Sequence, residues 1–234
     1  MGPEYWAVVP AAGGGRRMSA GSPKQYLELR GRPVIVHTLE RLASFPPLRG
    51  IVVGLAPDDR HWSNLDFLPA KLLTTYVGGA ERAVTVLNGL RALSAHASPD
   101  DWVLVHDAVR PCLRSADTLK LVTEVDNHPD GGLLAVPLTD TVKRTDADGR
   151  IIATVARADL WRALTPQMFR LAALQQALER ALRENIAVTD EATAIEHNGG
   201  RPRLVAGHAD NIKITYASDL ALAELYMQQQ ERGA

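Results

Sequence analysis

The chain has 234 residues, of which 46% are apolar, and a formal net charge of −1. This length and apolar content are enough for one α/β domain with a substantial core. The nearly neutral charge excludes the global basic field of a nucleic-acid-binding protein, so a polyanionic ligand must be held by a local cluster of cations. The single cysteine, Cys112, excludes an internal disulfide and a cysteine-rich zinc site.

The N-terminal sequence MGPEYWAVVP lacks the charged start and the long apolar region of a signal peptide. No apolar run approaches the length of about 20 residues that a transmembrane helix needs. We therefore expect a cytoplasmic protein with no membrane partner.

Strand-like and helix-like segments alternate over the first 137 residues. Short β-branched runs bounded by Gly, Pro or Asp predict strands at 5–10, 50–56, 72–78, 101–106 and 131–137. Amphipathic stretches predict helices at 33–45, 81–95 and 115–128, the first beginning with Pro33 and the third capped by Ser115. Nearly continuous apolar strands separated by helices predict an α/β fold with a mainly parallel sheet and helices on both faces.

The rhythm changes after residue 137. Two polar strand-like segments flank the turn sequence DADGR, and we interpret residues 138–157 as a projecting β-arm because a polar hairpin is a poor core element. Helices are expected at about 170–185 and 189–198, then a short strand at 211–216 and a last helix at 218–231. No linker or repeat divides the chain, so we expect one domain over 1–234.

A glycine-rich loop with three cations follows the first predicted strand. Gly13 and Gly15 allow backbone N–H groups to approach an anion, and Arg16, Arg17 and Lys24 provide charge to neutralise phosphates. At the carboxyl end of a parallel strand this pattern favours phosphate binding, although glycine and arginine together also occur in a plain solvated turn.

Two familiar phosphate-binding motifs are excluded by spacing. The dinucleotide fingerprint requires a glycine at the position that Met18 occupies, which also argues against a dehydrogenase. The phosphate loop of NTPases requires Gly-Lys-Ser/Thr, and the sequence has none.

Asp107 ends the predicted buried strand 101–106, where a carboxylate is costly unless it has a partner. It is a candidate ligand of Mg²⁺, which bridges substrate phosphates. The alternative is a structural ion pair with Arg110. Lys213 lies in an apolar run after Asp210, and a lysine in such a run is more often exposed on an edge strand, so on its own it indicates little.

Together these stretches resemble one known family over residues 6–226. The sequences VVPAAGGGRRM, PKQY, GGAERAVTVLNGL, VLVHDAVRP, DTVKR, TPQMF, TDEATAIE and ADNIKIT occur in the order and spacing of 2-C-methyl-D-erythritol 4-phosphate cytidylyltransferases. The first loop is typical of nucleotidyltransferases in general, and TDEA and ADNIK narrow the family. The resemblance implies a Rossmann-like fold with a β-arm and a homodimer formed through that arm.

The implied reaction joins CTP to 2-C-methyl-D-erythritol 4-phosphate, giving 4-diphosphocytidyl-2-C-methyl-D-erythritol and pyrophosphate, in non-mevalonate isoprene biosynthesis. The attacking phosphate oxygen is already an anion, so no general base is needed. Fixed cations and Mg²⁺ are therefore expected to carry most of the catalysis.

The resemblance also assigns roles residue by residue. The catalytic cations are Arg17, Lys24 and Lys213, and the metal ligand is Asp107. The nucleotide-binding residues are Ala11, Ala12, Gly13, Gly15, Arg16, Gly79, Ala80, Thr85 and Ala108, with Thr85 expected to add a hydroxyl to main-chain recognition of the cytosine. The acceptor-binding residues are Arg110, Thr165 and Thr189, together with Thr141 and Arg157 from the partner's arm.

Several of these residues have ordinary structural alternatives. Gly79 also fits a plain turn, Thr189 a helix cap and Arg157 a solvated arm charge. The alternative enzyme is a cytidylyltransferase for another polyol phosphate such as ribitol 5-phosphate. A non-catalytic nucleotide-binding regulator is disfavoured because Arg17, Lys24 and Lys213 are all present. The sequence ends at Ala234 without a second enzyme, so we expect a monofunctional protein.

Overall fold

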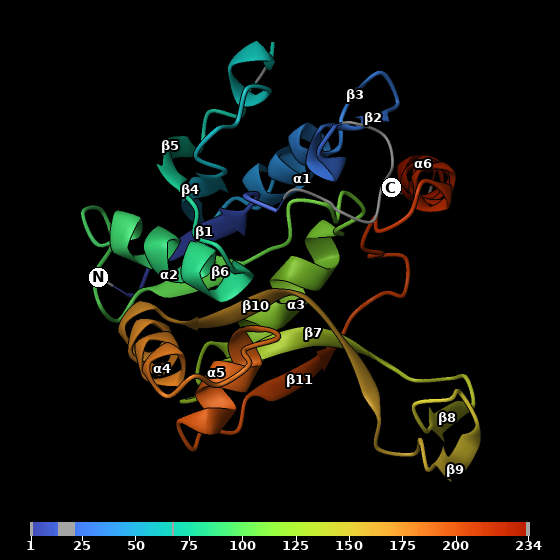
Figure 1. Ribbon diagram of the computed structural model, residues 1–234. Coiled ribbons are helices and arrows are strands. Elements are labelled where there is room, and N and C mark those ends of the chain that lie inside the picture. The colour runs from blue at the N-terminus through green and yellow to red at the C-terminus, as the bar shows by residue number, and fades with distance from the viewer. Residues whose placement is uncertain (1, 14–21, 67, 233–234) are drawn as a thin grey trace.

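The computed structural model describes residues 2–13, 22–66 and 68–232, and within them a seven-stranded sheet forms the centre of the molecule (Figure 1). Its strand order is β11-β7-β10-β6-β1-β4-β5. The strands are β1 (Tyr5–Pro10), β4 (Leu48–Leu55), β5 (Leu72–Val77), β6 (Trp102–Val105), β7 (Gly132–Pro137), β10 (Trp161–Arg170) and β11 (Arg203–Ala206). All neighbours are parallel except that β10 runs antiparallel to β6 and β7, which confirms the mainly parallel sheet.

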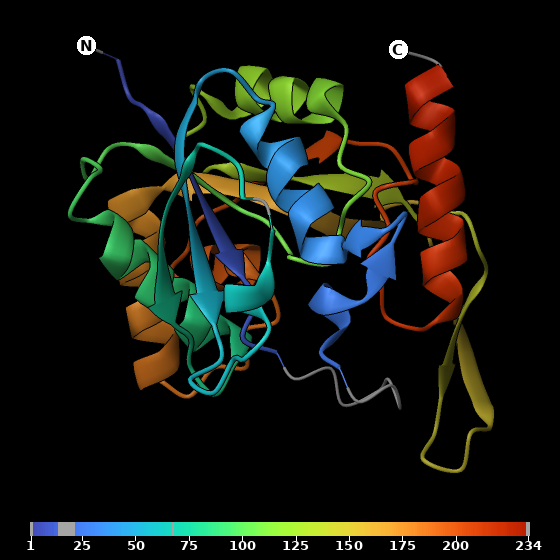
Figure 2. The ribbon, with the colours of Figure 1, turned by 90° about the horizontal axis from the view of Figure 1, so that it is seen from above.

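Helices cover both faces of this sheet, as predicted (Figure 2). They are α1 (Val34–Ala43), α2 (Arg82–Leu93), α3 (Ser115–Val125), α4 (Leu171–Arg183), α5 (Glu191–His197) and α6 (Ser218–Arg232). One core joins α1 and α3 to the sheet, and a second joins α2, α4 and α5 to the opposite face. Helix α6 packs at the edge of the molecule with a third, smaller cluster.

The alternation of side chains along β1 explains why one strand supports two cores. Ala7 and Val9 belong to the core of α1 and α3, whereas Trp6 and Val8 belong to the core of α2, α4 and α5. Successive side chains of a strand point to opposite faces, so a strand buried on both faces is apolar throughout.

The predicted arm is a separate two-stranded hairpin of β8 (Val142–Thr145) and β9 (Ile151–Val155). Both views show it extending away from the body of the molecule (Figures 1 and 2). Its apolar side chains Ile151 and Ile152 are exposed. The remaining short elements are the hairpin of β2 (Glu28–Leu29) and β3 (Arg32–Pro33) and the 3-10 turns η1 (Lys24–Tyr26) and η2 (Trp62–Asn64).

The strand predicted at 211–216 is wrong, because this segment is a loop in the structure. Its main chain is held by local and loop contacts instead of a strand ladder: the carbonyl of Asn211 accepts from Arg110, and the N–H of Ile214 donates to Val109. The sequence analysis also missed β10 and β11.

The capping role predicted for Ser115 is wrong as well. Arg114 occupies the cap position of α3 without a side-chain cap hydrogen bond, and the hydroxyl of Ser115 lies 3.3 Å from that of Ser44.

The order of the strands creates a switch point beside β1. The chain passes from β1 outward to β4 and β5, and then returns to β6 on the other side of β1. In open α/β sheets the crevice outside the carboxyl ends of the strands at such a point is where ligands bind. The loops after β1 and β6 are therefore the place to examine for a site.

Among the described residues, no helix combines the length and the apolar character needed to cross a lipid bilayer.

Candidate active site

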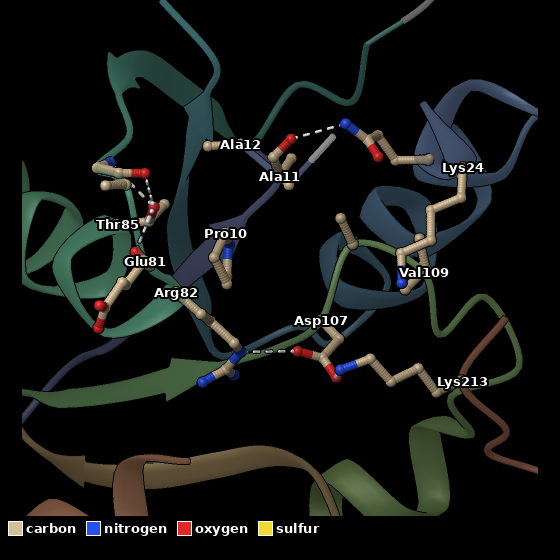
Figure 3. A pocket seen from close by; sticks show the side chains of 15 residues that line it. Pro10, Ala11, Ala12, Lys24, Glu81, Arg82, Thr85, Asp107, Val109 and Lys213 are labelled. Carbon is tan, nitrogen blue, oxygen red and sulfur yellow. Dashed lines mark hydrogen bonds and ion pairs between the residues drawn. The ribbon is translucent and has the colours of Figure 1, made fainter. Parts of the chain in front are cut away.

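Two neighbouring cavities open at the switch point. The first, of about 170 Å³, lies between the end of β1, the start of α2 and the loop after β6 (Figure 3). The second, of about 250 Å³, is bordered by the loop after β6, by β10 and by the segment before α5. Arg82, Asp107 and Lys213 line both cavities, so these three side chains form a shared wall.

Asp107 is the centre of this wall. Its carboxylate lies 3.1 Å from Nε of Arg82, 3.2 Å from Nε of Arg110 and 3.0 Å from Nζ of Lys213. In Figure 3, Arg82 and Lys213 approach it from opposite sides. Burial acts to raise the pKa of Asp107, but these three positive charges outweigh burial and hold the pKa well below its usual range. Asp107 is therefore a permanent anion that gathers three cations.

The same contacts test the prediction that Asp107 is a metal ligand. Both of its oxygens already face cations, and the described residues contain no cluster of three or more His, Cys, Asp or Glu side chains. A carboxylate has further lone pairs, and Mg²⁺ is often held by one carboxylate together with substrate phosphates and water. The donor set thus fits a magnesium ion carried by phosphates, and does not fit an ion held by these protein groups alone.

Lys24 lies in the lining of the first cavity at the start of the turn η1. The next residue, Gln25, is buried, and its Nε2 donates to the carbonyl of Ala11 at 2.7 Å. This hydrogen bond ties the turn that carries Lys24 to the end of β1. Figure 3 shows the side chain of Lys24 extending toward Val109. The sequence analysis missed the anchoring role of Gln25, because a polar residue in a loop gives no sign that it is buried.

The predicted nucleotide-binding residues that the structure describes lie together in the first cavity, which they reach from three separate segments. They are Ala11, Ala12, Gly13, Gly79, Ala80, Thr85 and Ala108. The other residues predicted for the glycine-rich loop, Gly15, Arg16 and Arg17, lie outside the described residues.

The hydroxyl of Thr85, which was predicted to contribute to recognition of the cytosine, makes hydrogen bonds within its own loop. Its Oγ1 accepts from the N–H of Gly79 at 3.0 Å and lies 3.1 Å from the carbonyl of Glu81, to which it donates. The side chain is buried. The hydroxyl thus uses its hydrogen and one lone pair to hold the loop before α2, and one lone pair remains. Thr85 supports the main chain that faces the cavity.

The loop between β5 and α2 requires glycine at two positions, because its main chain passes very close to neighbouring side chains. A Cβ on Gly79 would lie 2.3 Å from Cγ1 of Val84, and a Cβ on Gly78 would lie 2.4 Å from Cβ of Ala12. Since real Cβ atoms do not approach other atoms so closely, a side chain on Gly78 would push the loop away from the end of β1, and one on Gly79 would displace Val84 of α2. Gly78 therefore lets the loop before α2 approach the end of β1, and Gly79 lets it pack closely against α2.

The second cavity contains the predicted acceptor residues Arg110, Thr165 and Thr189 together with Lys213. Thr141 and Arg157 are exposed on or beside the arm and line neither cavity, and a guanidinium N–H of Arg157 donates to the carbonyl of Thr139. A single chain therefore brings together three of the five residues predicted to bind the acceptor substrate, namely Arg110, Thr165 and Thr189.

The orientation of the Thr165 hydroxyl follows from its partner His106. Burial lowers the pKa of His106 to about 4, so the imidazole is neutral at pH 7. Its Nε2 lies 3.1 Å from the carbonyl of Arg110, which can only accept, and we therefore place the ring hydrogen on Nε2. Nδ1 is then the acceptor of the hydroxyl of Thr165 at 3.0 Å. Oγ1 of Thr165 also accepts from the N–H of Asp107 at 3.1 Å, which leaves one lone pair for a ligand.

Asp210 anchors the loop that carries Lys213. Its Oδ2 accepts from Nη2 of Arg114 at 2.6 Å and from Nε2 of Gln230 in α6 at 3.0 Å. The next residue, Asn211, donates to the carbonyl of Thr165 at 2.8 Å. These bonds join the loop to the segments after β6 and in β10, and so position Lys213 beside Asp107.

The sequence analysis missed Arg82 and Glu191 as parts of the site. Arg82 opens α2 and Glu191 opens α5, and the partly exposed guanidinium of Arg82 forms an ion pair with the buried carboxylate of Glu191. The capping role considered for Thr189 belongs to Asp190, whose side chain accepts from the N–H of Thr193. The acids of the TDEA sequence were visible in the sequence, but nothing in it indicated their partners.

Comparison with known proteins places this geometry in context. The family described as "IspD: 2-C-methyl-D-erythritol 4-phosphate cytidylyltransferase" matches residues 5–229. The protein of that name from Pseudomonas aeruginosa is 54% identical over 219 residues, which cover 93% of this chain and 94% of that protein. The one from Hahella chejuensis is 49% identical over 225 residues, which cover 96% and 93% of the two chains.

Solved structures agree with the sequence relatives. A crystal structure of a 4-diphosphocytidyl-2C-methyl-D-erythritol synthase superimposes with a TM-score of 0.85 at 35% identity, covering 97% of this chain and 100% of the other. The 2-C-methyl-D-erythritol 4-phosphate cytidylyltransferase of Francisella tularensis gives 0.83 at 34% identity, covering 95% and 99%.

The hydrogen bonds of Thr165 predict that two substitutions at this position lower the free energy of unfolding by different amounts. Thr165→Val keeps the shape but leaves the N–H of Asp107 without its partner, so the free energy of unfolding should fall by about 1–3 kcal/mol. Thr165→Ser keeps the hydroxyl and should lose less. Urea denaturation measures both, and equal stability of the two variants would contradict the hydrogen-bond assignment.

Proposed function

Since the chain belongs to the 2-C-methyl-D-erythritol 4-phosphate cytidylyltransferase family, we propose that its two adjoining cavities hold the two substrates of the reaction on either side of Asp107. The enzyme transfers CMP from CTP to 2-C-methyl-D-erythritol 4-phosphate. In this proposal the first cavity receives CTP and the second receives the acceptor. The observation that carries it is the wall of Arg82, Asp107 and Lys213, which faces both cavities.

The chemistry requires positive charge where the two phosphates meet. A phosphate oxygen of the acceptor forms a bond to the α-phosphorus of CTP, and the bond to pyrophosphate breaks. The attacking oxygen carries negative charge already, so no residue has to remove a proton from it. Repulsion between the phosphates is the main barrier, and preorganised cations reduce it.

We assign this charge to Lys24 and Lys213 among the described residues, and to Arg17 from the sequence and the resemblance. Lys24 lines the first cavity and not the second. Lys213 lies on the shared wall and is held there by Asp107. Arg110 and Thr165 bind the acceptor in the second cavity. The main chains around Ala11 and Gly79 border the cytosine, which they recognise by shape and hydrogen bonding.

Magnesium belongs to the proposal because Asp107 fits an ion carried by the triphosphate. When bound, Mg²⁺ supplies additional positive charge at the phosphate oxygens. Asp107 would be its carboxylate ligand from the described residues, in addition to holding the neighbouring cations.

We also propose one nucleotidyltransferase domain that forms a homodimer in the cytoplasm. The arm supports the dimer because its exposed Ile151 and Ile152 lack a core of their own, and because Thr141 and Arg157 lie away from the cavities of their own chain. Cys112 is a free, buried thiol, which fits a reducing compartment.

Lys24→Met should lower turnover by ~100-fold or more without unfolding the protein, because it removes one preorganised cation from the nucleotide cavity. The measurement is release of pyrophosphate from CTP in the presence of 2-C-methyl-D-erythritol 4-phosphate and Mg²⁺. Lys120→Met, on α3 and outside the lining of both cavities, is the control.

A turnover of Lys24→Met close to that of the unmodified enzyme, at an unchanged melting temperature, would remove Lys24 from the mechanism. Ribitol 5-phosphate in place of the acceptor tests the alternative substrate in the same assay. The family assignment requires the methylerythritol phosphate to give the higher kcat/KM.

Asp107→Asn should raise the Mg²⁺ concentration needed for half-maximal activity and lower the maximal rate, because the amide is a weaker ligand and no longer counters the three cations. A magnesium titration of pyrophosphate release checks this. Asp100→Asn changes an exposed acid before β6 and serves as the control. If the magnesium titrations of Asp107→Asn and of the unmodified enzyme superimpose, Asp107 is not a metal ligand. Its role would then be limited to holding the neighbouring cations.

The shared-site dimer predicts complementation between two inactive variants. Lys24→Met and Arg157→Met should each be nearly inactive, because every site then lacks one residue. In a mixed dimer one site receives both substitutions and the other receives neither. After refolding an equal mixture, about half of the dimers are mixed and roughly a quarter of all sites should be active.

The experiment requires proof that mixed dimers form, which two different affinity tags provide. Activity that remains at the level of the single variants, although mixed dimers are isolated, would mean that each site is built within one chain.

A further inference from the structure

Glu191 is a buried carboxylate for which the reaction gives no direct task. It opens α5, its side chain is completely buried, and it is not among the described residues that line the two cavities. Both of its oxygens face Arg82: Oε1 lies 2.5 Å from Nη1, and Oε2 lies 3.1 Å from Nη2. A fully buried carboxylate is costly, so its place in the structure needs an explanation.

Arg82 connects Glu191 to the wall between the cavities. Its two terminal nitrogens are held by Glu191, and its Nε donates to Oδ1 of Asp107 at 3.1 Å. A guanidinium is planar, so two parallel hydrogen bonds to one carboxylate fix both the plane and its direction. Glu191 thereby aims Nε of Arg82 at Asp107 (Figure 3 shows the contact between Arg82 and Asp107).

The contact with Arg82 determines which oxygen of Asp107 remains for the other cations. Oδ1 faces Arg82, and Oδ2 faces both Arg110 and Lys213. A rotation of the carboxylate would disturb the contacts of all three cations at once. The position of Lys213 on the shared wall therefore depends on how firmly Arg82 is held.

A second ion pair of α2, that of Arg91 and Glu179, serves as a comparison because it only joins two helices. Arg91 of α2 pairs with Glu179 of α4 at 2.9 Å, and the side chains are 55% and 35% exposed. That pair joins two helices at the surface and touches neither cavity. The pair of Arg82 and Glu191 differs from it because its carboxylate is completely buried and because Arg82 continues to Asp107.

We propose that Glu191 is a positioning residue for phosphoryl transfer, which acts through Arg82 to fix Asp107 and thereby Lys213 at the wall between the two substrates. The proposal rests on the roles assigned above to Asp107 and Lys213. It also joins the two sides of the site, because Glu191 follows directly after Thr189 and Asp190 of the second cavity, whereas Arg82 borders both cavities.

Glu191→Gln tests the proposal because it keeps the shape and removes the charge. The amide presents an NH₂ group to one of the Arg82 donors, so the guanidinium loses one partner and its fixed direction. We expect kcat to fall by ~10- to 100-fold, the effect of misplacing a group that acts on the reacting phosphates, with KM for CTP changed less than ~3-fold. Glu179→Gln, which removes the same type of partner from Arg91, should leave both constants unchanged.

A double-mutant cycle separates positioning from general structural support. If Glu191 acts through Asp107, then Glu191→Gln should not lower kcat further in an Asp107→Asn background. A merely structural role would lower kcat by the same factor in both backgrounds. If Glu191→Gln does not fold, Glu191→Asp replaces it, because it keeps the charge but withdraws the carboxylate from Arg82 by one methylene.

The outcomes distinguish this inference from the proposed function. Independent effects in the cycle, or a kcat of folded Glu191→Gln within twofold of the unmodified enzyme, overturn the role of Glu191 while Asp107→Asn remains impaired. A normal kcat of Asp107→Asn would instead overturn the role proposed for Asp107 itself, and the inference with it.

Discussion

A single buried carboxylate, that of Asp107, organises the site. Three cations converge on it from the start of α2, from the loop after β6 and from the loop before α6. Without this negative charge, their mutual repulsion would separate the segments that carry them. Other groups hold the segments that carry these cations. Asp210 anchors the loop of Lys213, and the buried His106 hydrogen-bonds to Arg110 and Thr165, which line the second cavity.

The body of the fold could be predicted because its strands are buried on both faces. Such strands are short, continuous apolar runs, and β1, β4, β6 and β7 were found for this reason. By contrast, β10 begins with three exposed residues and contains Pro166, and β11 is short and mostly exposed. The segment 211–216 has the composition of a strand, but its carbonyl and N–H groups are used by Arg110 and Val109. Local composition does not reveal a partner that lies about a hundred residues away.

In the candidate site, too, some features could be predicted from the sequence and others depended on distant partners. Motif spacing predicted that residues far apart in the sequence would gather, and the structure places seven of the nucleotide residues in one cavity and Arg110, Thr165 and Thr189 in the other. Thr141 and Arg157 line neither cavity. The state of each polar group was not predictable. The hydroxyl of Thr85 is used inside its loop, and the pair of Arg82 and Glu191 joins residues separated by 109 positions. Hydrogen-bond donors and acceptors must be counted in three dimensions before a side chain can be assigned to a ligand.

The hydrogen bond between Thr165 and His106 determines which kind of ligand group can bind at Thr165 in the second cavity. Because the hydrogen of this hydroxyl points at the imidazole, Thr165 presents only a lone pair to the cavity. A phosphate oxygen, which itself has only lone pairs when ionised, gains nothing there, whereas an alcohol can donate a hydrogen bond. The ammonium of Lys213, which lines the same cavity, has the reverse preference. Under the proposed function, a substrate with hydroxyls at one end and a phosphate at the other would thus bind in one direction, with its phosphate toward Lys213.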